Sequence, residues 1–506
     1  MVEVKEGKRP SAGVALFWNG VGKVFRELVR FTIGVLLARL IRPSEFGIIG
    51  LVIVVVAICD RIQEGGIKAA IVKERNLSES DLTTALIVNL TLSGIVFTGL
   101  LWSADWLAIF FREPLLVQVV PFLAIGLLID STVIVHNAIL TREMRFEEQA
   151  RAGFWSALIS GLSGLIYAFI QPTVWALVFS SLIGKLSYAA FLWSYRAYVP
   201  KSRPSMGSFI KLTRYGGKIA LSSLIESVSN NALPLIIGKQ FGSVQLGLWN
   251  RASSMKEIPL NNIYLITQPV IFARLCEQNH NRKLQRLTYR RINHLMAYTI
   301  ASLMMFVVFH SETIVQVVLG ETWLESAKYL SLLSLFGIFH QMTRLNNDIV
   351  MSSGNANLVL KHEIFRKGLF FFAILLSWPW GISGMLQAIV AQAAVSYIIM
   401  LLAVQNALRI STVNQLAVFG GYFGVAFVAG FLSKQSHWGD SSLQLFFSLI
   451  VSGISYVGVT IWLSRFLRLR GQLEMYRFLC TLIMKAPPRF HKTRLILERL
   501  LVSTKR

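Results

Sequence analysis

Residues 45–64 read EFGIIGLVIVVVAICDRIQE, an apolar run that ends in charged side chains. A helix that crosses the hydrocarbon core of a bilayer needs about 20 mostly apolar residues. This stretch is long enough, and similar stretches recur along the 506 residues, of which 54% are hydrophobic and 15% charged. Ordinary soluble proteins carry about 25% charged residues. The sequence therefore predicts an all-α polytopic membrane protein and excludes disordered, collagen-like and disulfide-scaffold chains.

Fourteen segments qualify as spans, and no link between them is large enough to form a soluble domain. The predicted transmembrane helices are 14–40, 45–64, 82–108, 116–140, 152–171, 174–194, 215–238, 245–271, 293–319, 329–353, 367–383, 384–404, 415–432 and 443–464. With the N-terminus inside, Lys and Arg concentrate in the cytoplasmic links and are sparse in the outward links. Both termini are therefore expected in the cytoplasm, with 465–506 as a basic cytoplasmic tail along the membrane surface.

The two halves of the chain share short patterns at a fixed spacing. Two pairs of segments lie 200 residues apart: Leu36-Leu37-Ala38-Arg39 with Ile236-Ile237-Gly238-Lys239, and Glu45-Phe46-Gly47-Ile48 with Gln245-Leu246-Gly247-Leu248. We predict two parallel six-helix repeats around a central cavity, an N-lobe at 1–205 and a C-lobe at 206–405. Two appended helices at 406–464 follow. Paired repeats of this kind are common in transporters.

Charged side chains inside predicted spans are costly in hydrocarbon, so each implies a cavity or a partner. Lys23, Arg26, Glu27 and Arg30 share one helix face, because residues three and four apart are neighbours. We expect this stripe to line the cavity and to meet an anionic substrate, since arginine can donate two parallel hydrogen bonds to phosphate. The alternative is an amphipathic entry helix whose cations touch lipid headgroups.

The charged and polar residues of the predicted spans form two sets of candidate site residues. The predicted substrate-cavity residues are Lys23, Arg26, Arg30, Arg61, Lys185, Trp249, Asn250, Arg251, Lys256 and Arg344. The predicted ion-coupling or pairing residues are Glu27, Asp60, Glu64, Glu226, Glu257 and Asp348.

Several of these residues allow two interpretations. Asp60 and Glu64 either pair with Arg26 or Arg30 or carry a coupling H⁺ or Na⁺. The segment 249–251 offers an aromatic face and polar groups to a sugar, or else forms an interfacial belt with a snorkelling arginine. Arg344 and Asp348 are expected to pair because they lie four residues apart on one helix. Lys185 and Asp130 stand alone in the sequence, the first as a cavity candidate and the second as a buried polar contact or a cavity group.

At this point the sequence resembles a known family. Leu37-Ala38-Arg39-Leu40 with Glu45-Phe46-Gly47, the segment from Gly65 to Ile71, the segment from Leu246 to Ala252, and Leu319-Gly320-Glu321-Thr322-Trp323 carry the resemblance. They are similar to the Wzx-type and colanic-acid-exporter-like flippases of the multidrug/oligosaccharidyl-lipid/polysaccharide exporter superfamily. The resemblance implies export of undecaprenyl-pyrophosphate-linked oligosaccharide across a bacterial inner membrane, in lipopolysaccharide or exopolysaccharide biosynthesis.

Two other functions remain as alternatives. A multidrug or cation antiporter of the same superfamily would favour a net acidic pocket, whereas the interior charges lean cationic. A membrane glycan polymerase would be expected to carry large outward loops with catalytic residues, and we find neither these loops nor a nucleotide loop, triad or metal cluster. We therefore expect a non-enzyme without cofactor or metal, with H⁺ or Na⁺ as candidate coupling ions. Membrane lipids and other polysaccharide assembly proteins are the candidate partners, and nucleic acid is not.

Overall fold

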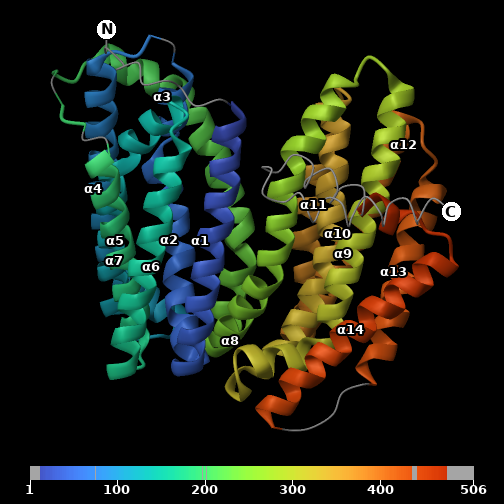
Figure 1. Cartoon of the computed structure of the whole chain (residues 1–506). Helices are drawn as coiled ribbons and strands as arrows, with labels where there is room; N and C mark the ends of the chain where they lie inside the picture. The colour runs from blue at the N-terminus through green and yellow to red at the C-terminus, as the bar shows by residue number, and fades with distance from the viewer. Residues whose placement is uncertain (1–11, 75, 196–197, 201, 436–440, 476–506) are drawn as a thin grey trace, which may run out of the picture. The chain divides into compact units, whose positions relative to one another are not determined.

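The computed structural model describes residues 12–74, 76–195, 198–200, 202–435 and 441–475, and these are helical with short links and no strand. Figure 1 shows the helices in chain order. The first part contains α1 (Ala12–Leu40), α2 (Pro43–Glu64), α3 (Ile67–Lys73), α4 (Glu79–Phe111), α5 (Leu116–Arg142), α6 (Phe146–Ile170), α7 (Val174–Tyr195) and α8 (Met206–Glu277). The second part contains α9 (Arg282–Val318), α10 (Ser326–Ser352), α11 (Ala356–Ser377), α12 (Gly381–Leu408), α13 (Thr412–Lys434) and α14 (Ser442–Phe466), with 3₁₀ turns η1 (Glu321–Trp323) and η2 (Trp378–Trp380).

Each of the fourteen predicted segments overlaps a helix of the structure, although 215–238 and 245–271 share α8 and 367–383 runs from α11 through η2 into α12. Eight helical stretches of the described chain are long and apolar enough to cross a membrane: α4, α5, α6, α7, α9, the stretch Ala356–Leu408 that holds α11 and α12, α13 and α14. The protein is therefore a multi-pass membrane protein. That all fourteen segments cross stays a prediction. Most of the predicted tail, residues 476–506, lies outside the described residues.

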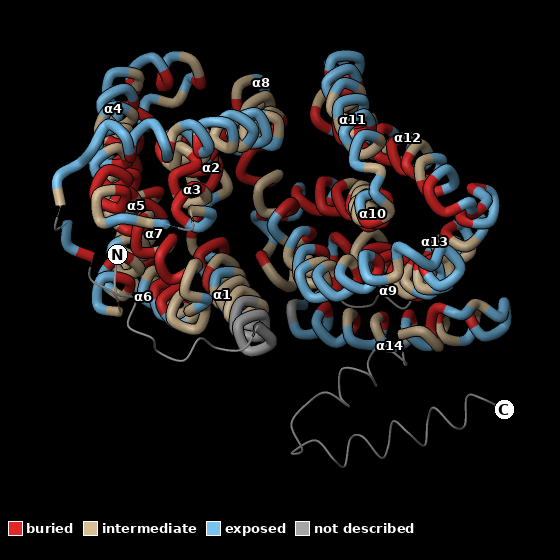
Figure 2. The backbone as a smooth tube through the Cα atoms, turned by 90° about the horizontal axis from the view of Figure 1, so that it is seen from above, coloured by how far each residue is buried: buried red, intermediate tan, exposed pale blue. Residues whose placement is uncertain are grey.

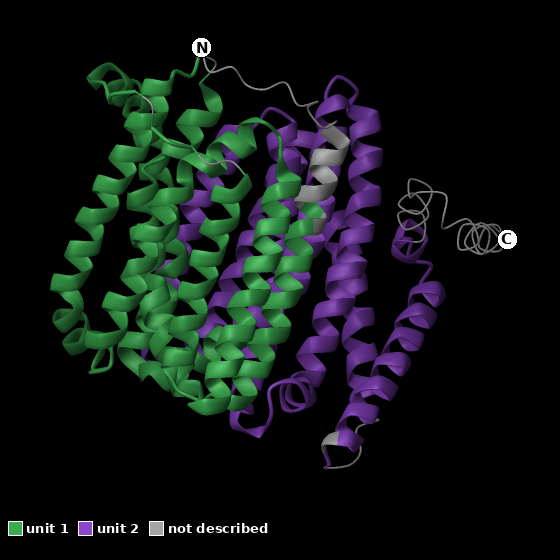
Figure 3. Ribbon diagram, turned by 60° about the vertical axis from the view of Figure 1, so that its left-hand side comes forward, with its two compact units in different colours: residues 1–251 green, residues 252–506 purple. Residues whose placement is uncertain are grey.

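The chain forms two compact units, residues 1–251 and 252–506, coloured separately in Figure 3. The boundary falls inside α8, whereas the sequence pattern places the start of the second repeat at 206. A packing unit and a sequence repeat are different properties, so the predicted lobes stay a prediction.

Small residues let the helices of the first unit approach closely. α6 packs on both α1 and α7. A Cβ added at Gly161 of α6 would lie 1.9 Å from Ile33 Cδ1, and one at Gly164 would lie 2.8 Å from Ser180 Cβ. Without the hydrophobic effect to drive helices together inside lipid, such close van der Waals contact is a main source of association.

α8 contains the break that the sequence predicts between residues 238 and 245. Gly242 adopts φ 84° and ψ 178°, a conformation that glycine reaches without a steric cost, while the helix continues on both sides. Around this break the two predicted repeats touch. A Cβ at Gly47 would lie 1.7 Å from the carbonyl oxygen of Ser243, and one at Gly247 would lie 2.0 Å from that of Pro43. In the predicted repeats residue 43 corresponds to 243 and residue 47 to 247. Gly47 therefore contacts Ser243 and Gly247 contacts Pro43 in a reciprocal way, as a two-fold axis between the two turns would produce.

The second unit has one large buried core. It is built from α9, α10, α12 and α13, with α14 against α9 and α13 and with α11 against α12. Met296, Met304, Met342 and Tyr397 are among its fully or nearly fully buried side chains. Figure 2 shows buried residues on the facing sides of these helices and exposed residues on their outer sides, as expected when the outer surface meets lipid.

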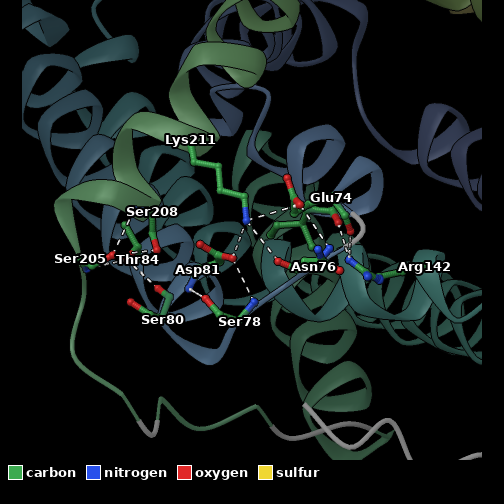
Figure 4. Close-up of polar contacts among 11 residues, drawn as sticks. Glu74, Asn76, Ser78, Ser80, Asp81, Thr84, Arg142, Ser205, Ser208 and Lys211 are labelled. Carbon is green, nitrogen blue, oxygen red and sulfur yellow. Dashed lines mark hydrogen bonds and ion pairs between the residues drawn. The ribbon is translucent and has the colours of Figure 1, made fainter. Parts of the chain in front are cut away.

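The start of α8 is attached to the end of α3 and the first turns of α4, as Figure 4 shows. Lys211 Nζ lies 3.1 Å from a carboxylate oxygen of Asp81 and 3.5 Å from one of Glu74. The backbone N–H of Ser205 donates to Thr84 Oγ1 at 3.1 Å. Asp81 is also part of the capping box with Ser78 that begins α4, so one carboxylate serves both the helix start and the lysine.

Candidate functional site

A cavity of about 690 Å³ opens within the first unit among α1, α2, α5, α6 and α7. Its charged lining residues are Arg26, Arg30, Asp60, Asp130 and Lys185. Its hydroxyl-bearing lining residues are Ser156, Ser160, Ser181 and Tyr188, and Ile53, Val56, Ala57, Leu123 and Ala157 supply apolar wall. The cavity therefore combines a net positive charge with neutral hydrogen-bonding groups inside a helical bundle.

Lys185 and Asp130 form an ion pair across the cavity wall, from α7 to α5. The ammonium nitrogen lies 2.5 Å from the carboxylate oxygen, and the two side chains keep 24% and 33% of their surface exposed. The expectation that these residues stand alone was wrong, because nothing in the sequence shows that α5 and α7 pack together. Asp130 is the charged lining residue that the predicted site set lacked.

Asp60 of α2 belongs to the same electrostatic group. The charges of Lys185 and Asp130 act on it, together with those of Arg61 and Glu64 on its own helix. The predicted pairing of Asp60 or Glu64 with Arg26 or Arg30 is not what the structure shows. Glu64 instead lies 3.1 Å from Arg61, on the exposed end of α2 and outside the cavity lining.

The charged face predicted on α1 divides between two environments. Arg26 and Arg30 line the cavity, and Lys23 and Glu27 do not belong to the lining. Glu27 lies 3.7 Å from Arg30, so it moderates one of the two arginines. Arg26 lies against Gly153 of α6, where a Cβ would come within 2.7 Å of its Nη1, and its buried Nε has no hydrogen-bond partner among the described residues.

Tyr188 is a further lining residue that the sequence analysis missed. Its hydroxyl donates to Asn137 Oδ1 at 2.9 Å, which fixes the ring at the cavity wall. An aromatic ring beside hydroxyl groups is suited to a sugar, because the ring offers an apolar face and the polar tip offers a hydrogen bond. A tyrosine in a long apolar segment gives no sequence signal that separates this role from ordinary packing.

The segment Trp249–Arg251 lies outside the cavity lining, and Asn250 and Arg251 lie against α1 and α2. The guanidinium of Arg251 lies 4.0 Å from the ring centroid of Phe46, and its Nη1 donates to the Gly34 carbonyl oxygen at 3.5 Å. Asn250 contacts α2 at Gly50. The indole N–H of Trp249 is buried without a partner in the described part of the chain. Asn250 and Arg251 therefore join α8 to α1 and α2.

The candidates in the second unit are arranged as local contacts. Lys256 is buried and lies 3.4 Å from Glu257 and 5.6 Å from the Phe336 ring centroid. Arg344 and Asp348 both meet Tyr264: the guanidinium lies 3.8 Å from the ring centroid, and the hydroxyl donates to the carboxylate at 2.9 Å.

Arg344 and Asp348 thus interact through Tyr264 as well as through their charges on one helix. Glu226, in the α8 part of the first unit, is exposed and does not line the cavity.

Comparison with known proteins places this arrangement in a family. The model of the polysaccharide biosynthesis protein family matches residues 36–328, more than half of the chain. The chain belongs to this family. The sequence analysis found a resemblance to the Wzx-type flippases of the multidrug/oligosaccharidyl-lipid/polysaccharide exporter superfamily, and that resemblance is confirmed.

Two relatives are similar to the chain over most of their length. One is the lipopolysaccharide biosynthesis protein WzxC of Escherichia coli (strain K12), 22% identical over 71% of this chain and 73% of the relative. Another is the teichuronic acid biosynthesis protein TuaB of Bacillus subtilis (strain 168), 22% identical over 66% of this chain and 72% of the relative.

Solved structures confirm the fold. The lipid II flippase MurJ, in an inward closed conformation, aligns with TM-score 0.67 and 13% identity over 90% of this chain and 99% of that one. An inward-facing multidrug resistance transporter of the MATE family aligns with TM-score 0.58 and 16% identity over 76% and 95%. At these identities the likeness concerns the fold alone. The predicted fold class, an all-α polytopic membrane protein, is correct.

Proposed function

We propose that the protein is a flippase that moves an undecaprenyl-pyrophosphate-linked oligosaccharide from the inner to the outer leaflet of a bacterial inner membrane by alternating access. The observation that carries the proposal is the cavity of the first unit, with three cations and two acids among its lining residues. Membership of the polysaccharide biosynthesis family supports a glycan as the cargo. MurJ, which shares the fold, is a lipid II flippase, and this supports a lipid-linked cargo.

Different lining residues can bind the two parts of such a headgroup, the pyrophosphate and the sugars. Arg26 and Arg30 would hold the pyrophosphate, because a planar guanidinium donates two parallel hydrogen bonds to phosphate oxygens. The hydroxyls of Ser156, Ser160 and Tyr188 would meet sugar hydroxyls. The lipid tail would stay in the bilayer while the headgroup crosses. The Asp130 carboxylate in the Lys185–Asp130 pair and the Glu27 carboxylate beside Arg30 reduce the net positive charge of the cavity. The anionic headgroup is therefore bound weakly enough to be released on the other side.

A deletion and complementation experiment tests this function. Removing the gene should cause lipid-linked repeat units to accumulate in the inner leaflet, and the wild-type chain should restore export. Arg26→Ala with Arg30→Ala should lower export by about tenfold or more at normal protein level, since charge-assisted hydrogen bonds contribute about 1.5–3 kcal/mol each. Lys23→Ala is the matched control on the same helix, outside the lining.

Undiminished export by the double variant would contradict the role of the arginines. Outer-leaflet accumulation in the deletion strain would indicate a polymerase. Altered drug tolerance with normal surface glycan would indicate an antiporter.

We also propose that H⁺ or Na⁺ supplies the energy at Asp60. This carboxylate lines the cavity beside the Lys185–Asp130 pair, so its occupancy would change the field that the cargo meets. In proteoliposomes, Asp60→Asn should remove the dependence of transport on a pH or sodium gradient, and Glu64→Gln, one turn further along α2 outside the lining, should retain it. Retained gradient dependence in Asp60→Asn would contradict the assignment.

The same proposal places both termini in the cytoplasm. In a chain whose three native cysteines are replaced by serine, single cysteines introduced at Ser80 and Ser441, in links predicted to face opposite sides, should react with an impermeant thiol reagent from opposite sides of the membrane. Both residues are described and lie at helix starts. Labelling of both from one side would refute the predicted topology.

A further inference from the structure

A second cavity, of about 610 Å³, lies within the second unit, away from the residues of the proposed transport site. Three separate segments form it: the first turns of α9, the end of the α12–α13 link with the first turns of α13, and the residues that follow α14. Its charged lining residues are Arg290, Arg291, Arg468, Arg470 and Glu474. Four arginines therefore face one carboxylate, a larger cationic excess than in the transport cavity.

These four arginines are available to a ligand. Each is exposed, and no ion pair is found for any of them within the described part of the chain. The floor beneath them is buried and polar. Tyr289 and Gln415 are 1% and 3% exposed, and the tyrosine hydroxyl donates to the glutamine amide oxygen at 2.5 Å. A cationic rim over a fixed polar floor is suited to a phosphate group, since arginine recognises phosphate by charge and by paired donors.

The segment that carries Arg468 and Arg470 is held in place rather than free in solution. The backbone N–H of Leu469 donates to the Ser464 carbonyl oxygen at 2.8 Å, and that of Gly471 donates to the Tyr422 hydroxyl at 2.5 Å. A Cβ at Gly471 would lie 2.7 Å from Tyr298 Cβ, so only glycine allows the segment to come this close. The two arginines are thus positioned before a ligand arrives, which lowers the entropy cost of binding.

The position of the pocket along the helices indicates where its ligand comes from. The polar start of α9 gives way to apolar sequence just after His294, which lines the pocket, and the pocket also takes in the link before α13 and the residues after α14. All three segments meet where apolar spans end, at the boundary between membrane and water. On the predicted topology this boundary is the cytoplasmic one, where anionic lipids attract basic side chains.

We propose that this pocket binds the phosphate group of an anionic phospholipid from the adjoining leaflet. The lipid headgroup sits among Arg290, Arg291, Arg468 and Arg470, and its acyl chains remain in the bilayer beside α9 and α13. The site is independent of the transported cargo, so it does not rest on the proposed function. Its role is to join the start of α9 to the segment after α14 through a bound lipid.

A lipid titration with the full-length protein tests the site. The protein is purified in a non-ionic detergent and titrated with dioctanoyl phosphatidylglycerol or dioctanoyl phosphatidylcholine, and native mass spectrometry measures the bound lipid. Arg468→Gln with Arg470→Gln should weaken phosphatidylglycerol binding by about fivefold for each arginine removed, since a basic residue near an anionic surface contributes about 1 kcal/mol. Arg290→Gln with Arg291→Gln, on a different helix, should give the same loss.

The matched control is Arg282→Gln with Lys283→Gln. It removes two exposed cations from the start of the same helix α9, outside the pocket lining, and should leave binding unchanged. Thermal unfolding without lipid shows that each variant is folded. Equal loss in control and pocket variants, no loss in either, or equal binding of the two lipids would overturn the proposal. Displacement of the lipid by millimolar inorganic phosphate would assign the pocket to free phosphate instead.

Discussion

An alanine at position 47 would place a methyl carbon 1.7 Å from the carbonyl oxygen of Ser243 and 2.4 Å from its carbonyl carbon. Unstrained contacts of this kind lie at roughly 3.5 Å, so the two backbones would have to separate by roughly 1.5–2 Å. Because both atoms belong to the backbone, no side-chain rotation relieves the overlap. Overpacking of this kind costs about 1–3 kcal/mol and occasionally more.

The matched control is Gly94→Ala, in the interior of α4, where no heavy atom lies within 4 Å of the added carbon. That substitution gains about 1 kcal/mol of helix propensity. Gly47→Ala, inside α2, gains the same propensity, so we expect the two variants to differ by about 1–3 kcal/mol in the free energy of unfolding, from overpacking alone. Purified protein in a mild detergent, unfolded by heat or denaturant and followed by tryptophan fluorescence, provides the measurement.

Two further variants sharpen the test. Gly247→Ala should resemble Gly47→Ala, since its added carbon lies 2.0 Å from the Pro43 carbonyl oxygen. Gly50→Ala should cost less, because it meets the end of the Asn250 side chain at 2.2 Å, and a side chain can move. The reciprocal contact would be refuted if Gly47→Ala and Gly94→Ala unfolded with the same free energy.

Other outcomes follow from single contacts. Lys185→Met or Asp130→Asn should each lower the free energy of unfolding by about 1–3 kcal/mol, because the remaining charged partner stays partly buried without its counter-charge. The double variant Lys185→Asp with Asp130→Lys should recover part of this loss. A double variant as unstable as the single ones would contradict the pairing. Burial alone would lower the pKa of Lys211, but hydrogen bonds and charges from its two carboxylate partners outweigh burial and raise that pKa above 10.5. The stability that the lysine contributes is therefore complete below pH 10.5 and lost as the pH rises through the raised pKa; unfolding measured across alkaline pH should show this loss in the wild type and not in Lys211→Gln. Phe46→Leu should cost about 0.5–2 kcal/mol beyond lost packing, because its ring lies against the partly buried guanidinium of Arg251. An Arg251→Met background should abolish that excess in the same unfolding assay.

The sequence predicts the helices well because bilayer thickness imposes their length and apolar character. Even the break in α8 falls between two predicted segments, at Gly242. The short helix α3 was not predicted, since its seven residues form no periodic apolar stripe that a window can detect.

The candidate site was predictable only where one helix face decides the outcome. Arg26 and Arg30 lie four residues apart on one helix face and both line the cavity, as the spacing indicates. The partner of Lys185 depends instead on which helices pack together, and a single sequence does not contain that information. Arg251 was assigned to the cavity on residue type, yet a guanidinium in a low-dielectric setting is equally well served by an aromatic ring and a backbone carbonyl.

The described residues of the connection from the first predicted repeat to the second make several contacts with α4. Thr83 Oγ1 lies 3.3 Å from Ser202 Oγ, Ser80 donates to the Arg203 carbonyl oxygen at 3.0 Å, and Lys211 continues the series one turn into α8. Flexible residues inserted after Arg203 would lengthen this connection, but Lys211 would still hold the start of α8 to Asp81. The described residues of this connection are thus held to α4 by side-chain contacts on both sides of the link, so it acts as a fixed joint and not as a flexible linker.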